Sequence, residues 1–111
     1  MKYLQNPVVL VVFLYTLGLS IPARCHDALE ISEFMAVNDT GLDDEDRDEE
    51  DWIEIHNAGT DKVNLEGWYL TDSSVNLTRW PFPAVSLAAD AYLVVFASGK
   101  DRRDPAGELH T

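Results

Sequence analysis

The 111-residue sequence has a single cysteine, Cys25, and few basic side chains. One cysteine cannot form a disulfide within the chain, so internal cross-linking plays no part in its stability. Lys and Arg number 8 against 20 Asp and Glu, which gives a formal net charge of −12. A charge of that sign repels phosphate backbones, and no nucleic acid is expected as a partner.

The familiar motifs of enzymes are also missing. The sequence has no Gly-x-Ser-x-Gly elbow, no zinc-ligand spacing and no phosphate-binding glycine loop. Paired carboxylates occur only inside a charge run, which offers no apolar pocket to raise a pKa for general-acid chemistry. No segment after the N-terminal apolar run shows sustained helical periodicity with caps. The residues therefore indicate an all-β protein without catalytic activity or a required cofactor.

The N-terminus has the order of features that is typical of a secretory signal peptide. Lys2 supplies a positive charge, residues 8–19 form an apolar run, and Ala23 offers a small residue for cleavage. The run is shorter than the roughly 20 residues that a membrane-spanning helix needs. We therefore expect cleavage after Ala23, a secreted or extracytoplasmic protein, and no membrane span afterwards; an uncleaved anchor or a buried helix is the alternative.

Cleavage there divides the chain into a signal peptide at residues 1–23, a short linker at 24–28 and one domain at 29–111. Cys25 would then lie in the linker, close to the new N-terminus. Bacterial lipoprotein processing requires a small residue before the cysteine, and Arg24 stands there instead. A free thiol is therefore favoured over lipid attachment, which stays open as the alternative.

Short apolar segments separated by turn signals fill the predicted domain. Residues 52–56 alternate cleanly, and residues 92–96 form an apolar run that is typical of a buried strand. Weaker strands are predicted at residues 29–37, 63–65, 68–70 and 78–80. The core is expected to include Ile53, Ile55, Leu70, Leu93, Val95 and Phe96. Large apolar area is expected from Trp52, Trp68, Phe82, Tyr92 and Phe96.

Two of these segments carry more specific expectations. In the first strand, Ile31 and Met35 are expected on one face, with Ser32 and Phe34 on the other. Gly67, before the short aromatic strand, suits a corner where φ is positive or a Cβ atom would clash.

Five blocks of the sequence resemble the lamin tail domain in residues and in spacing. They are ISEFMAVN at 31–38, DWIEIHNAG at 51–59, VNLEGWYLTD at 63–72, WPFPAVSLAADAYLVVFASGKD at 80–101 and GELHT at 107–111. The set is most similar to the bacterial, exported branch of the family. The resemblance implies an immunoglobulin-like β-sandwich that serves as an interaction module, often attached to other exported domains.

The resemblance stops at the C-terminus, where the family pattern should continue past the last block. An immunoglobulin-like sandwich has about seven strands, and fewer are predicted here. We therefore expect a C-terminally incomplete sandwich that lacks its last strands. Such a sandwich exposes an unpaired sheet edge, which invites aggregation or the addition of a strand from a partner.

The acidic run from residue 42 to residue 51 is the sharpest feature of the sequence. Asp44, Asp46 and Asp48 have the every-second-residue spacing that begins a calcium loop. Glu49 stands where that motif needs glycine, and Ile55 where it needs a distant glutamate, so the full motif is absent. A solvated loop is the favoured interpretation, and a looser Ca²⁺ site at these three aspartates is the alternative.

Glu54 and His56 lie two residues apart on one face of the predicted strand at 52–56. Such a pair can share a metal or a proton. The solvent-facing side of an edge strand is the more ordinary interpretation of the same pattern.

Taken together, the sequence predicts an exported, non-catalytic binding module whose partner is a protein or an extracellular surface. The alternative is an N-terminal fragment of a larger exported multidomain enzyme, nuclease or kinase-like, whose catalytic part is absent. A calcium-dependent structural module built on the acidic run is a third hypothesis.

Overall fold

The computed structural model describes residues 3–5 and 28–111, and its regular elements are all β-strands. They are β1 (Tyr3–Gln5), β2 (Leu29–Met35), β3 (Trp52–Asn57), β4 (Val63–Asn64), β5 (Tyr69–Thr71), β6 (Trp80–Pro81), β7 (Ser86–Leu87), β8 (Tyr92–Phe96) and β9 (Leu109–His110). The prediction of an all-β protein is confirmed. The predicted signal peptide, linker and Cys25 lie outside the described residues, except for β1 and Ala28. Within the described ranges, no helix is long and apolar enough to cross a membrane.

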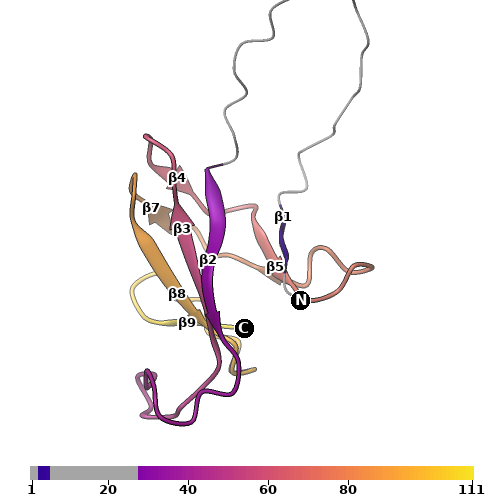
Figure 1. Ribbon diagram of the computed structural model, residues 1–111. Helices are drawn as coiled ribbons and strands as arrows, with labels where there is room; N and C mark the ends of the chain where they lie inside the picture. The colour runs from indigo at the N-terminus through magenta and orange to yellow at the C-terminus, as the bar shows by residue number, and fades with distance from the viewer. Residues whose placement is uncertain (1–2, 6–27) are drawn as a thin grey trace, which may run out of the picture.

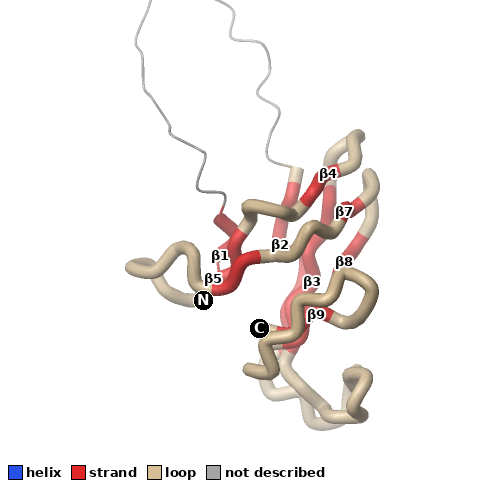
Figure 2. Tube along the Cα trace, turned by 180° about the vertical axis from the view of Figure 1, so that it is seen from behind, coloured by secondary structure: helices blue, strands red, loops and turns tan. Residues whose placement is uncertain are grey.

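The strands form one large sheet and two small ones, arranged as a sandwich (Figure 1). The large sheet has the order β2-β3-β8-β9, in which β9 runs parallel to β8 and the other pairs are antiparallel. The small sheets have the orders β1-β5-β6 and β4-β7. β2 is therefore an edge strand, and it lies on the side of the domain where β5 and β1 lie (Figures 1 and 2).

The core lies between these layers and draws on all of them. Leu29, Ile55 and Val95 come from the large sheet, and Leu70 and Leu87 come from the small sheets. The predicted core is confirmed for Ile53, Ile55, Leu70 and Val95, whereas Leu93 is only partly buried and Phe96 is buried outside this core, against His110. This burial supplies the apolar surface that a small sandwich needs to offset the entropy of its chain.

The pairing of β2 with β3 contains a β-bulge. Ile31 pairs with Ile55 and Glu33 pairs with Glu54, so Ser32 is an extra residue with no partner on β3. An extra residue reverses the alternation of faces beyond it. The prediction that Ile31 and Phe34 point to opposite faces was therefore wrong, because simple alternation does not allow for an inserted residue.

Three of the predicted core aromatic residues, Trp52, Tyr92 and Phe96, lie on the other face of the large sheet, because they alternate along β3 and β8 with the residues that face the core. Trp68, Phe82 and Phe96 are buried and Trp52 is partly buried, but Tyr92 is 55% exposed. Tyr92 pairs with His56 on the outer face of the large sheet, where the two rings stack with centroids 4.2 Å apart. An aromatic side chain on that face covers a neighbouring strand instead of filling the core.

Gly67 marks the corner before β5, and its backbone φ is +86°. A Cβ atom added there would meet nothing within 4 Å. Of the two predicted reasons for a glycine at this corner, the positive φ is therefore the operative one.

The buried position of Phe96 gives a direct test of how β8 is placed. Phe96→Ala should lower the free energy of unfolding by about 3–5 kcal/mol, because it removes a large buried ring and leaves a cavity. Val75→Ala is the control, since Val75 is 93% exposed, and it should change the free energy by less than about 0.5 kcal/mol. Urea titrations followed by tryptophan fluorescence measure both. Equal effects of the two substitutions would show that β8 is misplaced.

Candidate functional site

The acidic run folds around one lysine that comes much later in the sequence. The Nζ atom of Lys100 donates hydrogen bonds to Asp44, to Asp46 at 2.9 Å and to Asp48 at 2.8 Å. The structure thus brings together the three aspartates that the sequence singled out, and it places a protein ammonium group among them. Lys100 was missed by sequence reasoning because it lies more than fifty residues away with no pattern that links it to the run.

The backbone of the run turns back on itself at Asp44. The Oδ1 atom of Asp44 accepts the backbone N–H groups of Asp46 at 2.9 Å and Asp48 at 3.0 Å. The N–H of Asp44 donates in turn to the carbonyl of Asp48. Arg47 completes the turn in the left-handed region, with φ at +68°. These bonds use carboxylate oxygen to satisfy backbone donors that a loop would otherwise expose to water.

Burial distinguishes Asp44 from its neighbours. Its side chain is 0% exposed, whereas the side chains of Asp46 and Asp48 are 39% and 57% exposed. The solvated loop predicted from the sequence is therefore wrong at Asp44, because like-charge repulsion is offset locally by Lys100. Asp46 and Asp48 keep the solvent exposure that the prediction gave them.

The charges of this cluster are mutually stabilised. Burial alone would raise the pKa of Asp44, but the Lys100 ammonium and the Asp48 and Asp46 N–H groups lower that pKa to about 2. Hydrogen bonds from Arg102 and then Lys100 lower the pKa of Asp46. The same aspartates, Asp44 first, raise the pKa of Lys100. All of these groups are accordingly charged at neutral pH.

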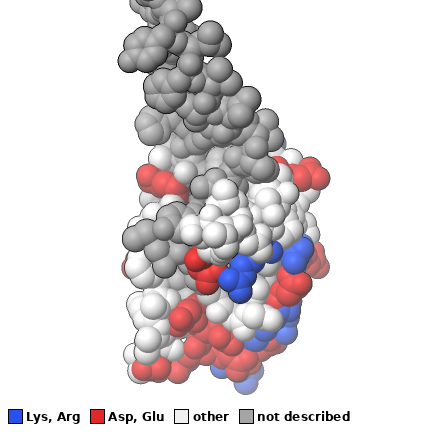
Figure 3. Space-filling view, turned by 90° about the vertical axis from the view of Figure 1, so that its right-hand side faces the viewer, with Lys and Arg blue, Asp and Glu red and all other residues white. Residues whose placement is uncertain are grey.

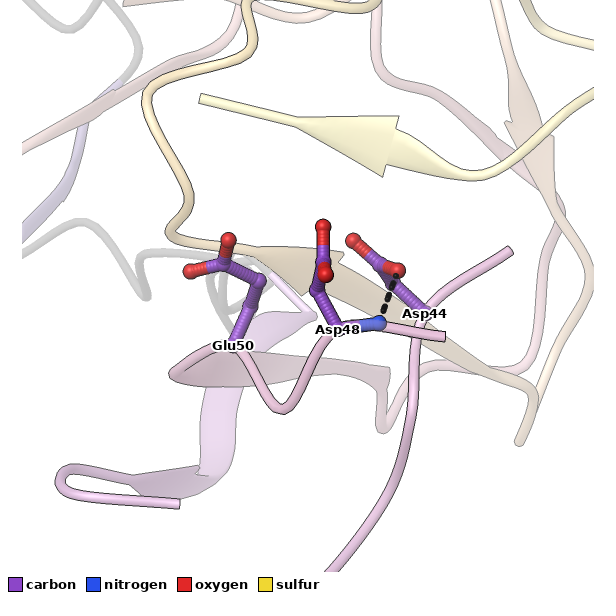
Figure 4. A group of neighbouring side chains, drawn as sticks. All are labelled: Asp44, Asp48 and Glu50. Atoms are coloured by element: carbon purple, nitrogen blue, oxygen red, sulfur yellow. Dashed lines mark hydrogen bonds between the residues drawn. The ribbon is translucent and has the colours of Figure 1, made fainter. Parts of the chain in front are cut away.

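A second grouping of acids shares two of these residues. Asp44, Asp48 and Glu50 each bring a carboxylate oxygen within 4.8 Å of the others (Figure 4). Oxygen ligands of this kind suit a hard cation such as Ca²⁺. Asp44 and Asp48 already bind Lys100, however, so a metal ion would compete with that ammonium group. The arrangement is an ion cluster that fastens the loop, and the weak Ca²⁺ site stays a prediction.

A serine and a histidine meet near the cluster, which the sequence gave no reason to expect. The Oγ atom of Ser98 lies 2.9 Å from Nδ1 of His110. His110 is 0% exposed and stacks on Phe96, with ring centroids 5.2 Å apart. A substrate has no access to an imidazole buried in this way, so the pair serves packing instead of nucleophilic catalysis.

The predicted pair of Glu54 and His56 does not form a joint site. Glu54 accepts a hydrogen bond from Ser32 at 2.7 Å. The imidazole of His56 lies between Glu30 at 2.9 Å and Asp90 at 3.0 Å. These two carboxylates, Glu30 first, raise the pKa of His56. The side chains belong to the outer face of the large sheet, but β3 lies between β2 and β8, so the edge strand of the more ordinary interpretation was wrong.

A groove runs along β2 at the edge of the large sheet. It has a volume of about 690 Å³ and is lined by residues 31–36, 51–53 and 97. Its charged lining residues, Glu33 and Asp51, are both acidic. Within the described residues, β2 has a neighbouring strand on one side only. Its other edge therefore presents backbone N–H and C=O groups that a further strand can pair with.

Phe34 is the most unusual residue in this groove. It pairs with Ile53, and directly opposed side chains of an antiparallel pair lie on the same face of the sheet. Ile53 is 2% exposed in the core, whereas Phe34 is 70% exposed. The core-facing side of β2 is covered at Leu29, partly covered at Ile31 and open at Phe34. The sequence signal for this surface was the apolar pair Phe34-Met35 in a strand that was otherwise assigned weakly.

Comparison with known proteins gives one positive finding. A family model described as Lamin Tail Domain matches residues 22–110, which is most of the chain. No curated protein and no solved structure matches this chain. The match spans β2 to β9 and leaves out β1.

Calcium provides the test of the acidic cluster. We expect millimolar Ca²⁺ to shift the melting temperature no more than sodium at the same ionic strength, because Lys100 already occupies the carboxylates of the three aspartates and salt only screens the remaining charges. Thermal melts of the purified chain in both salts make the comparison. A calcium-specific rise that disappears in the double variant Asp44→Asn, Asp46→Asn would instead identify a calcium site.

Proposed function

The chain belongs to the lamin tail domain family, and from that premise we propose that it is an exported, non-catalytic interaction module that binds its partner along β2. The family's immunoglobulin-like β-sandwich provides the rigid scaffold. The observation that carries the proposal is the open, core-facing side of β2 at Phe34. A large apolar side chain on a core face gains stabilisation when a partner removes it from water.

The groove beside Phe34 supports a protein partner in preference to a small molecule. It is lined by residues of the edge strand β2, and it continues past the end of β2 to Ala36. Extended peptides bind such edges through main-chain hydrogen bonds, with alternate side chains in pockets. The partner is therefore expected to be a protein segment, which is one of the two alternatives that the sequence analysis left open.

Two further observations support a role in binding instead of catalysis. The Ser98–His110 pair, which is the nearest approach to a nucleophile and base, has its imidazole fully buried. His56, the imidazole closest to the outer face, is held between two carboxylates and stacked on Tyr92. Neither histidine lines the groove along β2.

Export rests on the sequence of the N-terminus. Residues 1–23 have the charge, the apolar run and the small residue of a cleaved leader. Export and binding are separate parts of the proposal, and each has its own test.

Binding is tested with the purified chain and a displayed library of random peptides. We expect peptides to be enriched, and we expect Phe34→Ser to abolish the enrichment, since it removes the exposed apolar side chain. Val75→Ser is the control because it removes an even more exposed apolar side chain, from the loop between β5 and β6, and it should keep the enrichment. The absence of enrichment, or equal enrichment with both variants, would contradict an interaction role at β2.

Export is tested by N-terminal sequencing of secreted material, which should begin at Arg24. Recovery of the chain with Met1 in the membrane fraction would contradict export.

A further inference from the structure

The two faces of β2 offer different chemistry to a strand that pairs with its free edge. Ile31 and Phe34 lie on the core face, since their partners on β3 are the buried Ile55 and Ile53. Glu30 and Glu33 lie on the outer face. The bulge at Ser32 creates this division, because it reverses the alternation between Ile31 and Glu33.

The outer face is acidic beyond β2 itself. Glu33 pairs across the sheet with Glu54, so two carboxylates lie opposite one another. Neither takes part in an ion pair within the described residues. Like charges that are directly opposed on a sheet destabilise it unless a cation lies nearby. His56 is the only basic side chain that the pairing of β2, β3 and β8 places on this face, and Glu30 and Asp90 already hold it.

Given the interaction role proposed above, we infer that the partner is an extended protein segment in which apolar residues alternate with Lys or Arg. Its backbone pairs with the free edge of β2. Its apolar side chains cover Ile31 and Phe34 on the core face, and its cationic side chains lie beside Glu33 and Glu30 on the outer face. Alternation is required because successive residues of a strand point to opposite faces.

The charge of the surrounding surface favours the same partner. Figure 3, which looks onto the flank where β2 and β5 lie, shows Asp and Glu side chains gathered at the lower end of the molecule, with Lys and Arg side chains among them. That end is where the acidic loop lies in Figure 1. A cationic segment is attracted to such a surface before it docks, and its association is accordingly faster at low ionic strength.

A second copy of this chain is a poorer occupant of the same edge. Pairing of β2 with another β2 would bring Glu30 and Glu33 of one chain beside the same acidic residues of the other. No segment of the described residues alternates apolar side chains with Lys or Arg over the length of β2. Charge therefore favours a different protein.

The experiment uses two short fluorescent peptides of equal composition and the purified chain. In one peptide Lys alternates with Val and Ile; in the other the same lysines are grouped at one end. Fluorescence anisotropy should show at least about tenfold tighter binding of the alternating peptide, because only its residues match both faces of β2. Hydrogen exchange of the backbone amides in residues 29–35 should slow when that peptide binds.

Two variants test whether both faces of β2 contribute to the affinity for the alternating peptide. Phe34→Ser and Glu33→Lys should each weaken binding of the alternating peptide by roughly tenfold, since each removes a match to one face. The matched controls are Val75→Ser and Glu66→Lys, which change an exposed apolar and an exposed acidic residue away from β2 and should leave the affinity unchanged.

Several results would overturn the inference. Equal affinities of the two peptides would show that binding rests only on attraction between opposite charges. Equal effects of Phe34→Ser and Val75→Ser on the affinity would show that the peptide binds away from β2. A dimer in sedimentation experiments that Phe34→Ser dissociates would identify a second copy as the occupant. If the library enriches acidic or uncharged peptides in a Phe34-dependent way, the interaction role stands and the partner chemistry is wrong. If it enriches nothing, both are wrong.

Discussion

The contact on which the rest of this structure depends is the bonding of Lys100 to three aspartates in the loop between β2 and β3. That loop carries eight carboxylates between Asp43 and Asp51, with Arg47 as the only cation among them. Without a bound cation it would repel itself and stay extended in solvent. Lys100, which follows β8, supplies that cation and fastens the loop to the segment after β8, at the same end of the large sheet.

The folded loop also fixes the end of β2. The carboxylate of Asp51 accepts the backbone N–H groups of Val37 at 2.8 Å and Asn38 at 3.2 Å. The side-chain amide of Asn38 donates to the carbonyls of Leu42 and Glu50. Val37 is a β-branched residue with φ at +64°, a conformation that needs surrounding contacts to hold it. These bonds set where β2 ends, and with it the position of the groove.

Within β2, one inserted residue decides what the strand presents to a partner. Without the bulge at Ser32, Phe34 would lie on the outer face and Glu33 would point toward the core. With the bulge, the apolar residues Ile31 and Phe34 lie on the core face and the glutamates lie on the outer face. Only the first part of the strand is buried within the sandwich. Such a strand is held in the sandwich at its buried end and offers an exposed apolar side chain and a free edge at its other end. An interaction module needs both features.

Sequence reasoning recovered the features that depend on local patterns. Residues 52–56 and 92–96 form strands because their alternation and apolar content match a half-buried and a buried strand, and Pro81 lies in an edge strand as proline requires. The sequence also singled out the three aspartates of the acidic run. It did not place Lys100 among them, since a contact between distant segments leaves no local signal. The bulge at Ser32 was missed for a related reason, because an inserted residue is defined only by the partner strand.

The measurement that tests this account most directly is hydrogen exchange of the intact chain with and without the Lys100 ammonium group. Lys100→Met keeps the length of the side chain and removes its charge, and Lys62→Met does the same at an exposed lysine outside the cluster. The account predicts that only Lys100→Met speeds amide exchange in residues 38–51 and at the end of β2, and that it lowers the melting temperature by several degrees. If both variants leave exchange in these segments unchanged, Lys100 does not organise the loop, and the account of how β2 is positioned is contradicted.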